Sequence, residues 1–135
     1  MTVERLVADA SLALAMATAS ELPAWSSHIV LLAPHLLWSE TLSVLRESVW
    51  RGIVPASEAD RVRDRLAALP IEPRTPTNLR DRAWTVAERL GWAKTYDAEY
   101  VALAEIEGIP LLTLDARLKR GAARLIEVLG PTELG

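Results

Sequence analysis

The chain has 135 residues, of which 50% are hydrophobic and 24% charged, a composition that is typical of a folded domain with a real core and excludes a disordered protein. It contains no cysteine, which excludes disulfides, thiolate metal sites and cysteine nucleophiles, and its two histidines disfavour a His-rich zinc site. The formal net charge is −3, whereas domains that bind nucleic acids are usually basic.

The predicted elements alternate between short apolar strands and helices. In chain order they are a strand at 5–8, a helix at 11–20, a strand at 29–32, a helix at 35–51, a helix at 55–69 with Pro55 in its first turn, a weak strand at 69–72, helices at 78–90 and 95–107 that each end at a glycine, and strands at 111–114 and 125–129. Continuously apolar strands separated by helices are typical of a parallel sheet covered on both faces. We therefore expect an α/β fold and a single domain over residues 1–135.

No segment of the sequence is predicted to cross a membrane. The apolar stretch at 11–19 is too short for that. The N-terminal residues MTVERLVADAS carry Glu4 and Arg5 within their first apolar stretch and lack the features of a signal peptide. We therefore expect a cytoplasmic protein.

Two aspartates directly follow apolar strands. Asp9 comes after the strand at 5–8 and Asp115 after the strand at 111–114. Ligands of parallel α/β sheets bind beyond the carboxyl ends of the strands, so both side chains are expected at that edge. The alternative for each is an exposed acid in a turn.

Two further acids belong to predicted helices. Glu40 lies on an apolar stripe with Leu36, Leu37 and Val44, where an unpaired carboxylate would be costly. A partner such as Arg46, or a tilt toward solvent, would also explain it. Asp97 lies in the first turn of the helix at 95–107, where the helix dipole alone favours an aspartate.

Together, Asp9, Glu40, Asp97 and Asp115 predict one acidic site. Oxygen ligands without histidine or cysteine suit hard cations such as Mg²⁺ or Mn²⁺, which promote phosphodiester hydrolysis. Bound metal would offset the negative charge of the acids. Of the 15 basic residues 13 are arginine, the side chain better suited to forked phosphate contacts.

Other acidic-pocket proteins fit the sequence less well. A phosphatase with a DxD motif would need a second aspartate where the chain has Ser11, and a phospho-receiver domain would need an adjacent acidic pair near the first strand, where residues 8–10 are Ala-Asp-Ala. No glycine-rich phosphate loop is present.

Three blocks of sequence resemble a known family. They are VADAS at 7–11, WSETLSVL at 38–45 and TYDAEYVALAEIEGIPLLTLDARL at 95–118. In order and spacing the whole chain resembles the PIN-domain ribonucleases, in particular the toxins of VapBC-type toxin–antitoxin pairs. The family pattern places its acids on Asp9, Glu40, Asp97 and Asp115.

The resemblance implies a three-layer α/β/α fold with a five-stranded parallel sheet. It implies an endoribonuclease that depends on Mg²⁺ or Mn²⁺, with the same four acids as catalytic residues and metal ligands, and a homodimer inhibited by an antitoxin. The alternative is a catalytically silent PIN-like domain that binds only RNA or protein. Family members often carry hydroxyl residues at positions that match Ser11 and Thr113, which would support the acids from a second shell or serve merely as a helix N-cap and a strand residue.

Several other residues have two possible roles. Glu99 is either an additional acid of the site or a solvated one. The basic run of Arg117, Lys119, Arg120 and Arg124 would bind RNA phosphates or form a solvated helix face. Tryptophans are more often core or interface residues than RNA-stacking ones. The aromatic stripe of Trp92, Tyr96 and Tyr100 would form a dimer or antitoxin surface if exposed. The five tryptophans of the chain are Trp25, Trp38, Trp50, Trp84 and Trp92.

Overall fold

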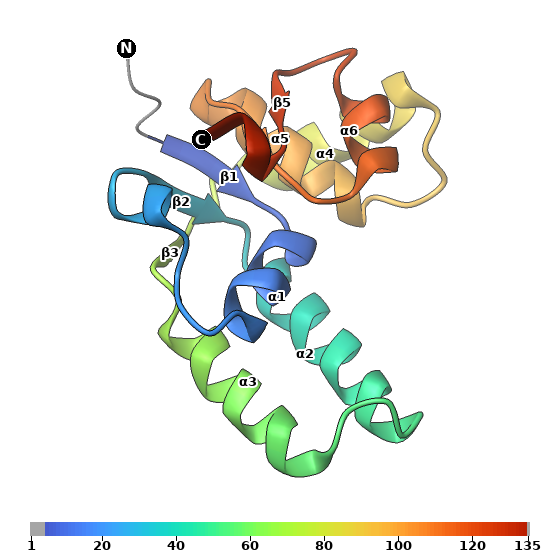
Figure 1. Ribbon diagram of the computed structural model, residues 1–135. Helices are drawn as coiled ribbons and strands as arrows, with labels where there is room; N and C mark the ends of the chain where they lie inside the picture. Colours follow the sequence, from blue (N-terminus) through green and yellow to red (C-terminus); the bar gives the residue numbers. More distant parts are fainter. Residues whose placement is uncertain (1–4, 135) are drawn as a thin grey trace.

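A five-stranded parallel sheet forms the centre of the molecule. The computed structural model describes residues 5–134; residues 1–4, where the N-terminal segment considered above begins, and residue 135 lie outside it. The strands are β1 (Arg5–Ala8), β2 (Val30–Ala33), β3 (Ile71–Pro73), β4 (Leu111–Leu112) and β5 (Val128–Leu129). Their order is β3-β2-β1-β4-β5, and every neighbouring pair is parallel (Figure 1).

Within residues 5–134, six α-helices and one 3-10 helix connect the strands, and a second 3-10 helix follows β5. They are α1 (Ala10–Thr18), η1 (Ala24–Ser27), α2 (Leu36–Trp50), α3 (Ala56–Ala68), α4 (Leu79–Leu90), α5 (Tyr96–Glu107), α6 (Ala116–Ala122) and η2 (Pro131–Leu134). Helices α1, α2 and α3 pack on one another, and α4 packs on α5, which lies against β1. The expected three-layer α/β/α fold is confirmed.

The strand order reverses at β1. From β1 the chain adds β2 and then β3 on one side, and it then crosses over to add β4 and β5 on the other. Crossovers between parallel strands are right-handed, so a reversal in direction puts the later helices on the opposite face of the sheet. The gap between the carboxyl ends of β1 and β4 is therefore the switch point, where ligands bind in folds of this type.

The core supports this edge with apolar side chains from the sheet and from α5. Leu6, Val7 and Ala8 of β1 are completely buried, as are Leu111 and Leu112 of β4. Strands β1 and β4 are therefore covered on both faces, as expected of continuously apolar strands.

The C-terminal part differs most from the prediction. The strands expected at 111–114 and 125–129 keep only two residues each. Leu114 is 50% exposed because the chain leaves the sheet there to begin α6, a helix not included among the predicted elements. The Leu125 N–H donates to the Ala122 carbonyl in a helical turn, so β5 begins only at Val128.

The predicted helix ends are largely confirmed. Gly91 and Gly108 follow α4 and α5 with φ values of 70° and 68°, a left-handed conformation that favours glycine. Pro55, expected in the first turn of its helix, instead occupies the N-cap position of α3. Within residues 5–134, none of the helices combines the length and apolarity needed to cross a membrane.

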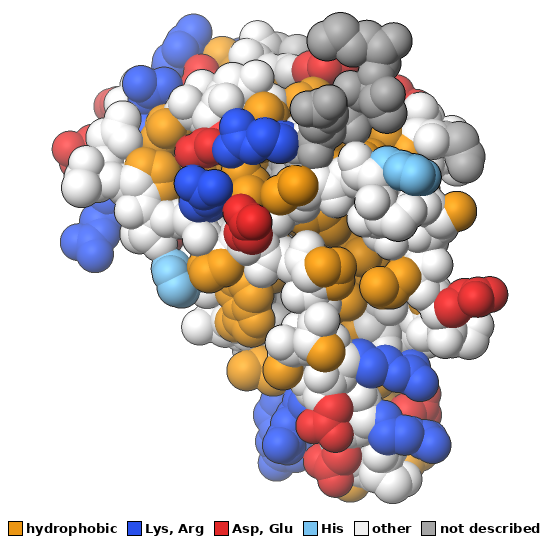
Figure 2. Space-filling view, turned by 90° about the vertical axis from the view of Figure 1, so that its left-hand side faces the viewer, with side chains coloured by type: hydrophobic (Ala, Val, Ile, Leu, Met, Phe, Trp, Pro, Cys, Tyr) orange, Lys and Arg blue, Asp and Glu red, His pale blue; other side chains and the backbone are white. Residues whose placement is uncertain are grey.

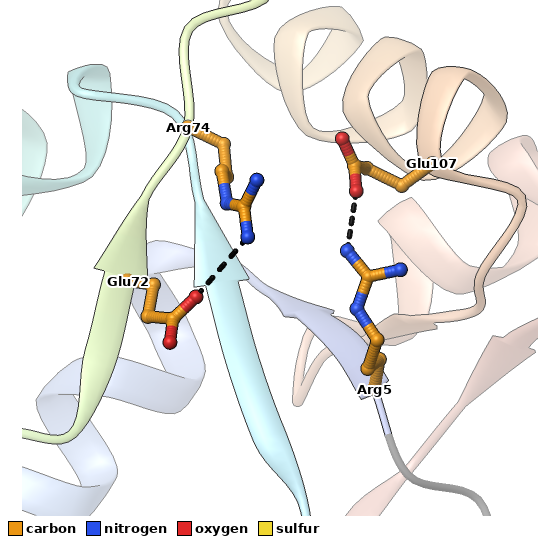
Figure 3. Close-up of polar contacts among 4 residues, drawn as sticks. All are labelled: Arg5, Glu72, Arg74 and Glu107. Carbon is orange, nitrogen blue, oxygen red and sulfur yellow. Dashed lines mark hydrogen bonds and ion pairs between the residues drawn. The ribbon is translucent and has the colours of Figure 1, made fainter.

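Two ion pairs lie on parts of the sheet that are distant from the switch point (Figure 3). Arg5 at the start of β1 donates to Glu107 at the end of α5, and Arg74, just past the edge strand β3, lies 3.3 Å from Glu72 on that strand. Figure 2 shows that hydrophobic side chains gather in the middle of one face, while acidic and basic ones mix at the tip where α2 ends and α3 begins.

Candidate active site

Asp9 lies between the end of β1 and the start of α1. Its side chain is 4% exposed, and Oδ1 accepts hydrogen bonds from the Ser11 hydroxyl at 2.7 Å and from the Leu12 N–H at 3.0 Å. Oδ2 accepts a hydrogen bond from the Thr113 hydroxyl. Asp9 is therefore the N-cap of α1, and the simpler role considered for Ser11, capping that helix itself, is wrong.

Burial decides the ionisation of Asp9. Loss of solvent raises the pKa of its carboxyl group, and the nearby charge of Asp115 raises it further. The hydrogen bonds from Thr113, Leu12 and Ser11 act in the opposite direction without cancelling the effect of burial. The structure thus holds a carboxylate whose negative charge is poorly compensated.

Thr113 connects two of the predicted site residues. Its hydroxyl is buried, donates to Asp9 and accepts the N–H of Asp115 at 2.9 Å. The Ser11 hydroxyl lies 3.3 Å from that of Thr113 and accepts the N–H of Leu114 at 3.1 Å. Both hydroxyls thus support the acids, and Thr113 is more than an ordinary strand residue.

Glu40 extends from the first half of α2 and is half-buried. Its Oε1 accepts a hydrogen bond from the hydroxyl of Tyr100 on α5. Within residues 5–134 no arginine or lysine lies within 4.0 Å of it, so pairing with Arg46 is not observed. The apolar stripe proposed for α2 is wrong at Val44, which is 48% exposed, although Leu37 is buried.

The pKa of Glu40 is raised. Burial contributes most, and the charges of Asp97, Asp9 and Glu99 add to it, against the hydrogen bond from Tyr100. Burial and the charge of Glu40 also raise the pKa of Tyr100, which keeps that hydroxyl protonated as a donor.

Asp97 lies in the first turn of α5. Thr95 occupies the N-cap position but makes no side-chain hydrogen bond to the helix. Burial raises the pKa of Asp97, as do the charges of Asp115 and Asp9, whereas Arg117 lowers it. This carboxylate therefore faces other acids, so the helix dipole is not the whole reason for its position.

Asp115 is the N-cap of α6. Its Oδ1 accepts the N–H groups of Arg117 at 2.9 Å and Leu118 at 3.2 Å. Its charge raises the pKa of Asp9 and of Asp97. Asp115 thus has a structural role in the helix as well as a place in the electrostatics of the acidic site.

The four acids predicted from the sequence influence one another electrostatically at the switch point. Among residues 5–134, however, no three acidic or histidine side chains are close enough to hold one metal ion together. Mg²⁺ commonly takes only one or two carboxylates and keeps several waters. In the described part of the chain, the Asp97 carboxylate, Glu40 Oε2 and Asp115 Oδ2 accept no protein hydrogen bond. These all-oxygen groups fit a hard cation.

Two other sequence features change their meaning. The charge of Arg117, in the basic run, lowers the pKa of Asp97, whereas Lys119 of the same run forms an ion pair with Glu133. The run is therefore not one continuous phosphate-binding surface. The aromatic stripe is also wrong: Tyr96 is 55% exposed, Tyr100 is buried, and Trp92 precedes α5 and packs on Gly121.

The tryptophans divide by exposure. Trp50 and Trp84 are 77% and 64% exposed. Trp25, Trp38 and Trp92 are partly buried against the core. The expectation of a core role thus holds for three of them.

Sequence reasoning found the acids but missed the donor to Glu40. Tyr100 was noticed only as a member of the aromatic stripe. Its position, three residues after Asp97 on the same helix, was the available signal, because i and i+3 side chains share a helix face.

Comparison with known proteins gives consistent results. The PIN domain family matches residues 6–124. The chain is 35% identical to the VapC ribonuclease Mb0985 of Mycobacterium bovis over 85 residues, which are 63% of this chain and 65% of that protein. It is 38% identical to ribonuclease VapC1 of Mycobacterium tuberculosis over 88 residues, which are 64% of this chain and 63% of that protein. The chain thus spans somewhat less than two thirds of these relatives.

A solved structure extends the similarity to nearly the full length. The fold matches the crystal structure of PAE2754 from Pyrobaculum aerophilum with a TM-score of 0.70 and 26% sequence identity. The match covers 99% of this chain and 95% of that one.

Proposed function

We propose that this chain, which belongs to the PIN-domain family, is a metal-dependent endoribonuclease and the toxin of a toxin–antitoxin pair. The proposal takes residues 1–135 as a single PIN-like domain acting in the cytoplasm. The names of its relatives, VapC ribonucleases, support the reaction and the class of partner.

The observation that carries the proposal is the meeting of acids from four separate elements at the switch point. Asp9 follows β1, Asp115 follows the segment after β4, and Glu40 and Asp97 come from α2 and α5. The charges of Asp9, Asp97 and Asp115 each raise the pKa of at least one other acid of this group. The pKa of Glu40 is itself raised by the charges of Asp97 and Asp9. A fold does not gather uncompensated carboxylates in this way for stability.

Asp9, Glu40, Asp97 and Asp115 would hold Mg²⁺ or Mn²⁺ and act as the catalytic residues. When bound, such an ion polarises a phosphoryl oxygen, lowers the pKa of a water molecule and stabilises the leaving oxygen. The chain itself supplies orientation. Thr113 and Ser11 fix Asp9, and Tyr100 fixes Glu40, as outer-shell partners commonly do for metal-binding carboxylates.

A second candidate is a catalytically silent PIN-like domain that binds RNA or protein only. The observation in its favour is that no three acidic or histidine side chains among residues 5–134 form a compact metal cage. A cleavage assay separates the two candidates.

The experiment compares wild type with Asp97→Asn and Asp64→Asn on structured RNA, with Mg²⁺, Mn²⁺ or a chelator. Asp64 is an exposed acid on α3 and serves as the matched control. We expect cleavage by wild type and Asp64→Asn only with metal, and loss of cleavage in Asp97→Asn. A wild type that binds RNA but never cleaves it would establish the silent domain.

The proposed partners are a second copy of the chain and an antitoxin that covers the acidic site. Light scattering and co-purification with the product of the neighbouring reading frame test them. A monomer at high concentration that does not bind this product would refute the partner proposal and leave the cleavage proposal intact.

A further inference from the structure

A groove of about 510 Å³ opens beyond the carboxyl ends of β2 and β3. Its walls are the start of α2 with His35 and Leu36, the loop 75–77, the first turn of α4 with Leu79, Arg80 and Asp81, and Glu99 of α5. A volume of this size is ordinary for a small-ligand site. None of the four predicted acids lines it, so the groove is distinct from the acidic site.

The groove nevertheless borders the acidic site. Leu36 in its wall is one helical turn before Glu40 on α2, and Glu99 in its wall follows Asp97 by two residues on α5. The charge of Glu99 contributes to the raised pKa of Glu40. A polymer bound across the acids would therefore meet this groove next.

The side chains of the groove suit a nucleotide. Arg80 is exposed, and among residues 5–134 it has no carboxylate within 4.0 Å, although its charge lowers the pKa of Glu99. The hydroxyls of Thr75 and Thr77 donate to no other residue in the described part of the chain. Leu36, Pro76 and Leu79 give the groove an apolar portion.

We propose that this groove is a subsite for one nucleotide of single-stranded RNA adjacent to the bond that is cut. Arg80 binds a phosphate of that nucleotide, the apolar portion contacts its base, and Glu99 accepts a hydrogen bond from a ribose hydroxyl. The inference rests on the proposed ribonuclease function and adds where the substrate lies. A free arginine beside hydroxyls and an apolar surface favours a nucleotide over an acidic peptide, which would leave the apolar portion uncovered.

The test compares Arg80→Gln with Arg89→Gln. Arg89 is exposed in the last turn of α4, at the other end of the same helix, so it controls for loss of one positive charge. Fluorescence anisotropy measures binding of a labelled single-stranded 12-nucleotide RNA at several salt concentrations, with every protein also carrying Asp97→Asn to prevent cleavage. Thermal melts check that each variant is folded.

We expect Arg80→Gln to weaken binding about tenfold and to reduce the slope of log K against log salt by about 0.7, the value for one phosphate contact on a single strand. In the cleaving background, KM should rise about tenfold while kcat changes little. Arg89→Gln should change neither quantity by more than about twofold.

Three results would overturn the subsite. If wild type cleaves RNA but Arg80→Gln and Arg89→Gln bind it equally, the groove does not hold a nucleotide. If Arg80→Gln weakens only the antitoxin complex, the groove binds protein instead. If wild type neither binds nor cleaves RNA, the proposed function fails and the subsite with it.

Discussion

Replacing Asp9 in two ways separates its charge from its hydrogen bonds. In Asp9→Asn the side-chain oxygen can still accept from Ser11 and Leu12, so the cap of α1 is kept, while the buried charge is removed. The amide nitrogen that replaces Oδ2 can donate to the Thr113 hydroxyl, whose own proton can turn to the Ser11 hydroxyl 3.3 Å away. In Asp9→Ala the cap is lost and the hydroxyl of Thr113 loses its acceptor.

The expected magnitudes differ in sign. Because burial raises the pKa of Asp9, folding disfavours its charged form, and Asp9→Asn should leave the free energy of unfolding at pH 7 unchanged or slightly higher. Asp9→Ala loses about 1 kcal/mol for the cap and about 1 to 2 kcal/mol for the unpaired donors, partly offset by the removed charge. A net loss of about 2 kcal/mol corresponds to a melting temperature lower by roughly 6 °C in a domain of this size.

The assay is thermal melting of wild type and both variants in chelator at pH 7, beside RNA cleavage with Mn²⁺. Both variants should lose cleavage, but only Asp9→Ala should lose stability. If Asp9→Asn were destabilised as much as Asp9→Ala, the carboxylate charge would be stabilising the fold, and the view of Asp9 as an uncompensated site residue would be wrong.

Four further outcomes are expected. Asp9, Glu40 and Asp97 have raised pKa values, so the folded state holds protons more tightly than the unfolded state, and the melting temperature of the metal-free protein should rise as pH falls from 7 toward 4; a fall over this range would contradict those shifts. Adding Mn²⁺ should raise the melting temperature of wild type at pH 7.5 but not that of Asp97→Asn, and equal responses would argue against binding at this site. Tyr100→Phe should lower cleavage about tenfold and stability by about 1 kcal/mol, whereas unchanged activity would show that its hydrogen bond does not position Glu40. Gly108→Ala should lower stability by about 1 kcal/mol because of its φ of 68°, with cleavage per folded molecule unchanged; a melt equal to wild type would refute this.

The sequence predicted the parts of the molecule that depend on local pattern. The strand at 5–8 and the helix ends at Gly91 and Gly108 follow from apolar runs and from glycine conformation, and the structure has them as predicted. Asp9 and Asp115 were expected at the edge of the sheet because each follows a predicted strand. Asp9 does directly follow β1, whereas Asp115 lies three residues past the end of β4, at the N-cap of α6.

The contacts within the site depend on residues distant in the sequence, which local pattern does not reveal. Thr113 meets Asp9 across 104 positions, and Tyr100 meets Glu40 across 60. The stripe assigned to α2 failed at Val44 because helical periodicity gives a face but not how far the neighbouring layer covers it. The helix at Ala116–Ala122 was not predicted, because it is short and directly follows an apolar run that predicted a strand.

The central position of β1 has a consequence for the synthesis of the protein. Proteins are made from the N-terminus, and early elements can fold while later ones are still absent. Helices α1 to α3 pack on one another and strands β1 to β3 pair with one another, but β4, the second neighbour of β1, is made only after α5. Until then Asp9 lacks Thr113, and Asp115 does not exist in the growing chain. In a ribonuclease built in this way, the acidic site would stay incomplete on the ribosome until Asp115 has been added to the chain.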